Sequence, residues 1–390
     1  MAPKALRVGR SHVWDTAIRR PGHVPALTRP GEAAVDLTPI RGARVFGTQL
    51  CADRPGTVLV QLNARRPDVA DLYELDLDTA RLTVLSENPG DVLSWLRTAE
   101  GRILTFSQAD DGTHLLCDWN AGAPRLISRF SGLDHPFGVS PSVPTPDGAG
   151  LWIGSARGSD RTRLVRVDLD TGEQIGVDSH PVFDLDTPRP EADQRFPSSL
   201  IVHPGDGELL GARYLGARQK IHALDPRFAE VLPRLAELSD GDLAHVSCDA
   251  GAQRWVVDFT HDRDPRVTWS YDHTTGTARQ LFRPYPHLDP ARLAPVTPIT
   301  ITARDGLDLP CHLTLRSGRS TATCRPSSCC TAAPGTATAG ATTRRCNCWP
   351  TAATPCCRST SAAPPATARP TPKPRSASSP AACTTTSSTP

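Results

Sequence analysis

A turn that contains glycine recurs five times between about Arg44 and Tyr285, and a β-rich run follows it each time. After a polar stretch, each unit then closes with a strand that ends in aspartate. The turns are ADRPGTVLV at Gly56, TAEGRILTF at Gly101, TPDGAGLWI at Gly148, PGDGELLGA at Gly207 and DAGAQRWVV at Gly251, and the strand ends are LYELD at Asp76, LLCD at Asp118, LVRVD at Asp168, IHALD at Asp225 and TWSYD at Asp272. The glycines lie 45, 47, 59 and 44 residues apart. A period near 45 residues with about four strands per unit is the signature of a β-propeller blade, so we predict an all-β fold of about five blades.

Two motifs inside this repeat also suggest ligand sites. DLDTGE, Asp168 to Glu173, has the alternating acids of a calcium loop, but it lacks the glycine and the distal glutamate of an EF-hand, and the same turn recurs in other units. We predict a plain hairpin there. GSARGSDRTR, Gly154 to Arg163, is glycine-rich and basic, but a phosphate loop needs the free amides of a helix N-terminus, and here a strand follows. We predict a solvated loop between strands.

The composition changes abruptly near the C-terminus. After Leu315 there is no Leu, Ile, Val, Met, Phe or Tyr, and after Asp308 there is no Asp or Glu. Such a segment cannot bury enough apolar area to offset the entropy of ordering the chain, so residues 318–390 are predicted to be disordered. Eight of the 12 cysteines lie in this tail, at positions 324, 329, 330, 346, 348, 356, 357 and 383. Without histidine or clustered CxxC spacing they do not indicate a metal site.

Charge and targeting features set limits on partners and location. The chain of 390 residues carries 43 basic and 41 acidic residues, a net charge of +2, which favours neither a nucleic-acid nor a membrane surface. The remaining cysteines, Cys51, Cys117, Cys248 and Cys311, are scattered like the buried thiols of a reduced protein. Since MAPKALRVGR lacks an apolar signal core, we expect a cytoplasmic protein. The histidines 203, 222, 245, 261, 273 and 287 form no HxH or HxxxH pair, so no metal or cofactor is expected.

Two segments resemble the propeller-bearing peptidases of the prolyl oligopeptidase type (S9), the acylaminoacyl peptidases and dipeptidyl aminopeptidases. They are VLVQLNARRPDVADLYELDLDTARLTVLSENPGDV, Val58 to Val92, and PVTPITITARDGLDLPCHLTL, Pro295 to Leu315. The resemblance spans about residues 35–315 and implies that an α/β-hydrolase domain begins near residue 299. It also implies a serine peptidase that cleaves short peptides or acyl-peptides, in which the propeller restricts access to a Ser–Asp–His site.

The hydrolase motifs that the resemblance implies are absent as written but return in another reading frame. GC-rich codons for CRPSSCCTAAPGT, Cys324 to Thr336, read one frame over, can give LPAVLLLHGGPWY, a buried strand followed by an HGGPW loop. The same shift turns CNCWPTAATPCCRSTSAAPPATA, Cys346 to Ala368, into QLLANRGYAVLQVNFRGSTGYGK, and CTTTSSTP, Cys383 to Pro390, into MHDDLIDA. Trp349 has a single codon, and its last base with the first two of Pro350 fixes the alanine of LLAN. We interpret residues from about Gly318 onward as an out-of-frame translation.

These patterns divide the chain into four parts. We expect an atypical, poorly ordered segment at 1–34, a partial propeller at 35–298, the first strand of a truncated hydrolase domain at 299–317, and the disordered tail at 318–390. One or two N-terminal blades are expected to be missing, so that the terminal blades expose apolar faces, although five units could also close into a smaller ring.

The expected function follows from this division. No catalytic, cofactor or metal residue is assigned to any position, and Ser327 and Ser328 are excluded because no nucleophile elbow surrounds them. The chain is expected to be inactive although its family is enzymatic. The alternative is a stand-alone propeller that binds peptide or protein partners.

Overall fold

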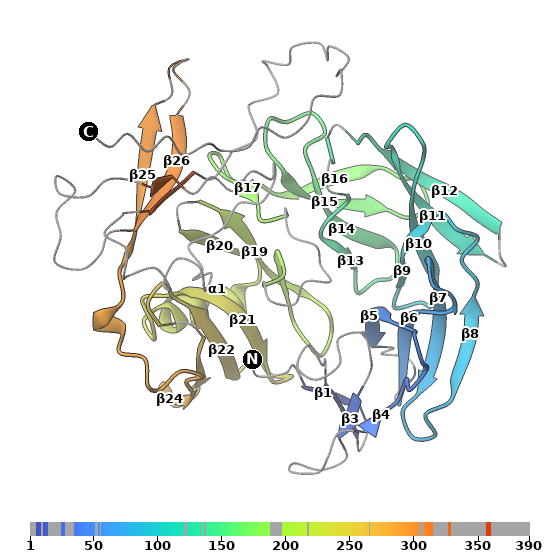
Figure 1. Ribbon diagram of the computed structural model, residues 1–390, viewed down its shortest axis with the longest axis horizontal. Helices are drawn as coiled ribbons and strands as arrows, with labels where there is room; N and C mark the ends of the chain where they lie inside the picture. The colour runs from blue at the N-terminus through green and yellow to red at the C-terminus, as the bar shows by residue number, and fades with distance from the viewer. Residues whose placement is uncertain are drawn as a thin grey trace, which may run out of the picture.

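The computed structural model describes residues 35–50, 54, 56–120, 123–132, 134–135, 138–187, 197–216, 218–264, 266–302, 304, 306 and 308–314, with short strands at 5–8, 11–14, 25–27, 327–328 and 356–359. Its centre consists of five antiparallel sheets of four strands each (Figure 1). Blade 1 contains β5 (Val45–Leu50), β6 (Thr57–Arg66), β7 (Val69–Asp76) and β8 (Leu82–Ser86); blade 2 contains β9 (Val92–Arg97), β10 (Ile103–Gln108), β11 (His114–Asn120) and β12 (Ala123–Phe130); blade 3 contains β13 (Ser142–Pro144), β14 (Gly150–Ser155), β15 (Arg163–Asp168) and β16 (Gln174–Asp178); blade 4 contains β17 (Asp184–Leu185), β18 (Leu200–Val202), β19 (Leu209–Leu215) and β20 (Gln219–Ala223); blade 5 contains β21 (Asp242–Cys248), β22 (Arg254–Thr260), β23 (Val267–Asp272) and β24 (Thr277–Phe282).

The blades are arranged around a centre, with β5, β9 and β13 toward it and β8, β12 and β24 at the rim (Figure 1). The prediction of a five-bladed β-propeller is confirmed.

The recurring glycine marks the turn after the innermost strand of a blade; in blade 4 this innermost position is shared by β17 and β18, which both pair with β19. Gly56 and Gly207 adopt φ angles of 89° and 75°, in the left-handed region that a side chain disfavours. In the fifth unit the left-handed residue is Ala252, next to Gly251, with φ 52°. In blades 1, 3 and 5 the recurring aspartate lies at the end of the third strand, where its side chain accepts backbone N–H groups, whereas Asp118 of blade 2 lies within β11 and pairs with Arg102. Asp168, for example, accepts those of Asp170 at 3.1 Å and Thr171 at 2.8 Å.

Blade 4 departs from the repeat after this aspartate. The helix α1 (Pro226–Ala236) takes the place of a fourth outer strand and contacts β19 and β20. Asp225 uses its side chain as its counterparts do, but the N–H groups that it caps, at 2.8 Å on Arg227 and 3.3 Å on Phe228, begin a helix. Pro226 favours this outcome because its fixed φ suits the first helical position. The sequence analysis predicted no helix here.

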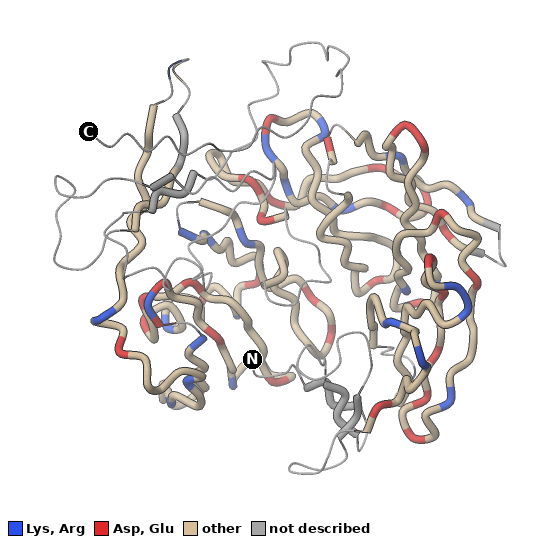
Figure 2. The backbone as a smooth tube through the Cα atoms, viewed as in Figure 1, with Lys and Arg blue, Asp and Glu red and all other residues tan. Residues whose placement is uncertain are grey.

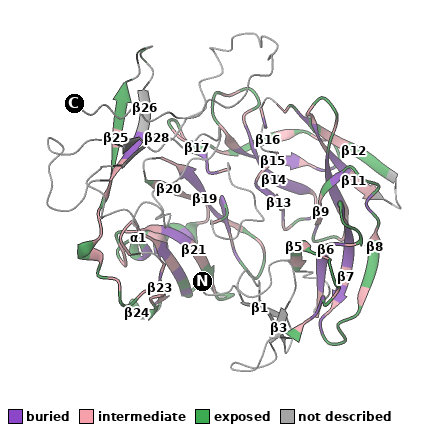
Figure 3. Ribbon diagram, in the orientation of Figure 1, coloured by how far each residue is buried: buried purple, intermediate pink, exposed green. Residues whose placement is uncertain are grey.

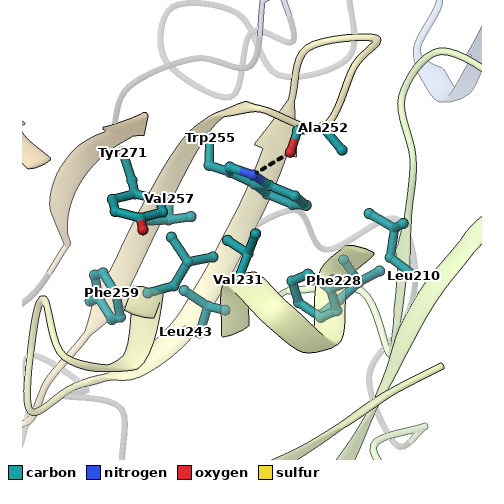
Figure 4. Packing of buried hydrophobic residues seen from close by; sticks show 11 residues of the cluster. Leu210, Phe228, Val231, Leu243, Ala252, Trp255, Val257, Phe259 and Tyr271 are labelled. Atoms are coloured by element: carbon teal, nitrogen blue, oxygen red, sulfur yellow. Dashed lines mark hydrogen bonds between the residues drawn. The ribbon is translucent and has the colours of Figure 1, made fainter. Parts of the chain in front are cut away.

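Apolar side chains fill every seam between consecutive blades. Leu59 and Leu72 meet Val92 and Trp95 in the first seam. The clusters of the second and third seams centre on β14, whose six residues are all buried. In the fourth seam α1 supplies Phe228, Val231 and Leu235, which pack against Trp255, Val257 and Phe259 of β22 (Figure 4). Each blade is therefore stabilised mainly by its neighbours.

The two end blades differ from the prediction that both expose apolar faces. The outer face of blade 1 is a buried cluster that includes Val58, Val60 and Leu62 and is covered by Leu37 and Ile40. Phe46 and Leu50 of its inner strand do remain 46% and 38% exposed.

Blade 5 buries one face only. In β22 the residues Trp255, Val257 and Phe259 are buried, whereas Arg254 before them and Val256 between them are exposed. The outermost strand of this blade, β24, is exposed along its length (Figure 3). The same outer face carries Asp258, Thr268 and Ser270, so it is polar. The prediction of an apolar face is wrong here, because Arg254 and Asp258 flank the single exposed Val256 on the outer side of β22, whereas β14 is apolar on both sides.

A further sheet stands at the N-terminal end. Strands β1 (Ala5–Val8), β2 (Ser11–Trp14), β3 (Pro25–Leu27) and β4 (Val35–Asp36) pair in that order. Segment 1–34, expected to be poorly ordered, contributes three strands, and the rest of it lies outside the described residues. Strands of three or four residues are too short to show the alternation on which sequence analysis depends.

The C-terminal sheet is of a different kind. Strands β25 (Val296–Thr302) and β26 (Asp308–Thr314) form an antiparallel hairpin. The single strand predicted from Ile299 to Leu315 is therefore wrong, because the chain reverses near Gly306, where φ is 83°. Strand β28 (Cys356–Ser359) pairs antiparallel with β26, and β27 (Ser327–Ser328) pairs parallel with β28. The tail predicted to be disordered thus supplies two short strands, and its other residues lie outside the described part of the chain.

Adjacent valines in β22 test the one-sided burial of blade 5. Val257 is 0% exposed and Val256 is 45% exposed. We expect Val257→Asp to lower the free energy of unfolding by about 4 kcal/mol or more, because it buries an unpaired charge. Val256→Asp should cost less than about 1 kcal/mol. Urea denaturation followed by tryptophan fluorescence measures both, and equal losses would show that the outer face is packed.

Candidate functional site

Sequence analysis assigned no catalytic residue, so the candidate sites are the places where the fold gathers polar side chains. Ser327 and Ser328 lie in β27, opposite Cys356 and Cys357 of β28. DLDTGE forms the hairpin between β15 and β16, as predicted, and GSARGSDRTR spans the loop between β14 and β15, as predicted. Among the residues that the structure describes, no group of three or more His, Cys, Asp or Glu side chains is arranged to hold a metal ion.

Two imidazoles, a phenol and a carboxylate meet at the junction of blades 3 and 4. Asp178, at the end of β16, accepts the hydroxyl of Tyr214 at 2.7 Å, and the same oxygen lies 2.9 Å from His222 Nδ1. The ring of His180 lies 5.3 Å from that of His222, and its Nδ1 accepts the backbone N–H groups of Val182 and Phe183. The pKa of Tyr214 is raised well above its ordinary value, chiefly by burial and secondly by the hydrogen bond to Asp178.

This cluster holds the two blades together and has no nucleophile. The Asp178 oxygen already serves two partners, and one nitrogen of His180 is engaged by the backbone. A carboxylate on Nδ1 is the contact that orients a general-base histidine, but among the described residues no serine or cysteine is hydrogen-bonded to His180 or His222. The residues come from positions up to 44 apart, so no local motif could have revealed the cluster.

A groove of about 800 Å³ runs along the rim of the seam between blades 1 and 2. Leu85, Ile103 and Trp119 give it apolar walls, and Arg65 and Asn88 lie at one end. Opposite charges are interspersed around it, as they are over the described blades in general (Figure 2).

Arg65 and Asn88 converge on Asp71, whose side chain is completely buried. The guanidinium of Arg65 donates to both carboxylate oxygens, at 2.9 and 2.8 Å, and the N–H of Asn88 donates at 2.7 Å. The Asn88 amide in turn donates to the carbonyl of Val92 at 2.7 Å. This network links β7 to the start of blade 2. Burial acts to raise the pKa of Asp71, but the bonds from Arg65 and Asn88 together outweigh it and keep that pKa below the ordinary value.

A second hollow, of about 410 Å³, lies between the last turn of α1 and blade 5. It exists because a helix follows the rim where the other blades have a strand. Tyr271 and Leu238 line it, together with the ion pair of Arg234 and Glu237.

No helix in the described part of the chain is long and apolar enough to cross a membrane.

The chain is similar in sequence to a known peptidase. The chain is 26% identical over 299 residues to dipeptidyl aminopeptidase BIII of Pseudoxanthomonas mexicana. That alignment covers 75% of the chain but only 41% of the relative. The chain resembles the prolyl oligopeptidase-type (S9) serine peptidases. No family model matches it.

Solved structures of this peptidase type share the fold. A puromycin hydrolase superposes with a TM-score of 0.62 at 16% identity, over 92% of this chain and 57% of that one. A puromycin-hydrolyzing peptidase of Mycobacterium tuberculosis gives 0.61 at 14% identity, over 92% and 57%. A prolyl endopeptidase gives 0.56 at 12% identity, over 91% and 60%. The chain thus spans little more than half the length of these S9-type structures.

The Asp71 network predicts an acid-sensitive seam. Because the folded pKa of Asp71 is lower than the unfolded one, its contribution is complete above the unfolded value of about 4 and is lost as the pH falls through the folded value. We expect Asp71→Asn to cost about 2 kcal/mol at pH 7 and to flatten the loss of stability between about pH 4 and pH 2. Thermal melts over that range measure this, with the exposed Asp78→Asn as control. A parallel pH dependence in wild type and Asp71→Asn would contradict it.

Proposed function

We propose that this chain is the propeller and the first strands of an S9-type serine peptidase whose hydrolase domain is interrupted by a shift of reading frame near Gly318. The whole protein would hydrolyse short peptides or acyl-peptides, with the propeller limiting access to the active site. The chain as written would have no hydrolase activity, since it lacks the HGGPW loop and the nucleophile elbow that the resemblance implies. The observation that carries the proposal is the order of the C-terminal sheet.

That sheet runs β25-β26-β28-β27, with β27 and β28 parallel. The five blades are antiparallel throughout, so a parallel pair marks the beginning of a different domain. Parallel neighbours need a crossover of about a dozen residues or more, and residues 329–355 provide that length. An open sheet with crossovers is what an α/β-hydrolase domain would build after the propeller.

The shifted reading frame supports the same conclusion independently. Ser327–Ser328 falls within the run that the shift turns into LPAVLLLHGGPWY, and Cys356–Ser359 falls within AVLQVNF. As written, CCRS and SS have little strand propensity, whereas the shifted residues are rich in Val and Leu. Strands therefore occur where the shifted sequence, rather than the written one, favours them.

The alternative function is a stand-alone propeller that binds a peptide or protein partner. Its support is the packing of blade 5, whose polar outer face needs no neighbour and so resembles the capping unit of a repeat array. In either case we propose a cytoplasmic location, which the free thiols of Cys117 and Cys248 support. We propose neither a nucleic-acid partner nor a membrane partner for the chain.

Activity measurements separate the two functions. The purified chain should not react with a fluorophosphonate probe, and a gene in which one base is added between the codons for Leu315 and Cys324 should yield a protein that does. That restored protein should release a chromophore from short peptide p-nitroanilides. Labelling of the chain as written at a unique serine would refute the proposal.

Resequencing the region that encodes Leu315 to Thr331 completes the test. One additional base in the natural gene, relative to a gene that encodes the chain as written, would mean that the intact peptidase exists in the cell. If the written frame is correct and the restored protein is inactive, the binding-propeller alternative is favoured.

A further inference from the structure

The loop between β22 and β23 touches both ends of the connection that leads from the propeller to the C-terminal sheet. This connection, residues 283–295, leaves blade 5 after β24 and reaches β25, which lies beyond the ring in Figure 1. The loop contributes Asp262 and Asp264, two carboxylates separated by one residue.

The first contact fixes the start of the connection. Arg283 Nε donates to Asp264 at 3.0 Å, and Arg283 Nη2 donates to the carbonyl of Leu288 at 3.2 Å. Both side chains of this ion pair are about 30% exposed. Arg283 therefore folds the connection back on itself while it is held to the loop.

The second contact fixes the end of the connection. Asp262 accepts the backbone N–H of Val296, the first residue of β25, at 2.6 Å. The Asp262 side chain is 15% exposed, and its other oxygen lies 2.8 Å from His261 Nδ1. A charged acceptor in a largely buried position makes a stronger bond than an exposed one.

The connection between these contacts has little freedom of its own. It contains prolines at 284, 286, 290 and 295, and Asp289 caps the short helix η1 (Pro290–Arg292). Pro-rich segments act as semi-rigid spacers, so a rotation of β25 against blade 5 is absorbed mainly at the two ends. Both ends are held by one loop.

We propose that residues 261–264 form a latch that sets the orientation of the C-terminal sheet relative to the propeller. Asp262 is its positioning residue, and release of the Val296 N–H frees β25 to swing about the proline-rich connection. The latch joins two parts that this chain contains, so it does not depend on whether a catalytic domain follows.

Hydrogen exchange of the full chain, read by mass spectrometry, tests the latch. In Asp262→Ala the amides of 296–302 should exchange about tenfold faster, since a bond to a charged acceptor is lost. Trypsin should also cleave sooner after Arg292, an exposed residue in the connection. Asp262→Asn keeps an oxygen acceptor and should fall between the wild type and Asp262→Ala.

The control is Asp160→Ala, in the corresponding loop of blade 3, where the aspartate is exposed. It should leave both readouts unchanged. Unchanged exchange at 296–302 in Asp262→Ala would overturn the latch. Faster exchange in β22 as well would also overturn it, because Asp262 would then support blade 5 itself.

Discussion

The fold depends on the burial of two faces of each inner blade at once. In β14, Leu151 and Ile153 pack against blade 2 while Trp152 packs against blade 4, and β19 is buried along most of its length. A single four-stranded sheet cannot cover two apolar faces, so no inner blade is stable without its neighbours. Side-chain amides reinforce the apolar seams. Gln61 bonds the N–H and C=O of Trp95, and Gln49 bonds those of Arg97, so both glutamines extend the backbone pairing of blade 1 onto β9.

The two end blades, 1 and 5, each have an outer face with no neighbouring blade, and they differ in how that face is kept from exposing apolar side chains. Blade 1 covers its outer face with residues 37–43 of its own chain, whereas blade 5 makes its outer face polar. The helix α1 belongs to this second solution, because it adds Phe228, Val231 and Leu235 to the last apolar seam and enlarges the side of blade 5 that is buried (Figure 4). The hollow beside α1 is a by-product of fitting a helix where the other blades have a strand.

The C-terminal sheet has none of this support. Its hairpin is held to the propeller by Asp262 and by the connection that Arg283 folds back. Beyond the hairpin, β27 and β28 are built from residues with almost no apolar side chain to bury. Their parallel pairing is accounted for if the chain retains the arrangement of a domain whose side chains the shifted frame has replaced.

Sequence alone determined the blades and their turns. The glycines at 56, 101, 148 and 207 and the aspartates at 76, 168 and 272 act within a few residues, and their spacing therefore defines the repeat without tertiary information. The break in composition after Leu315 was equally visible, because composition does not depend on contacts.

Tertiary structure decided which local structure the same sequence signals form in different surroundings. Asp225 begins a helix because Phe228 and Val231 find an apolar seam to fill, and the outer face of blade 5 is solvated because no blade covers it. The cluster around Asp178 and the contact of Asp262 with Val296 join residues more than 30 positions apart. Only the closing of blades against one another could bring those residues together.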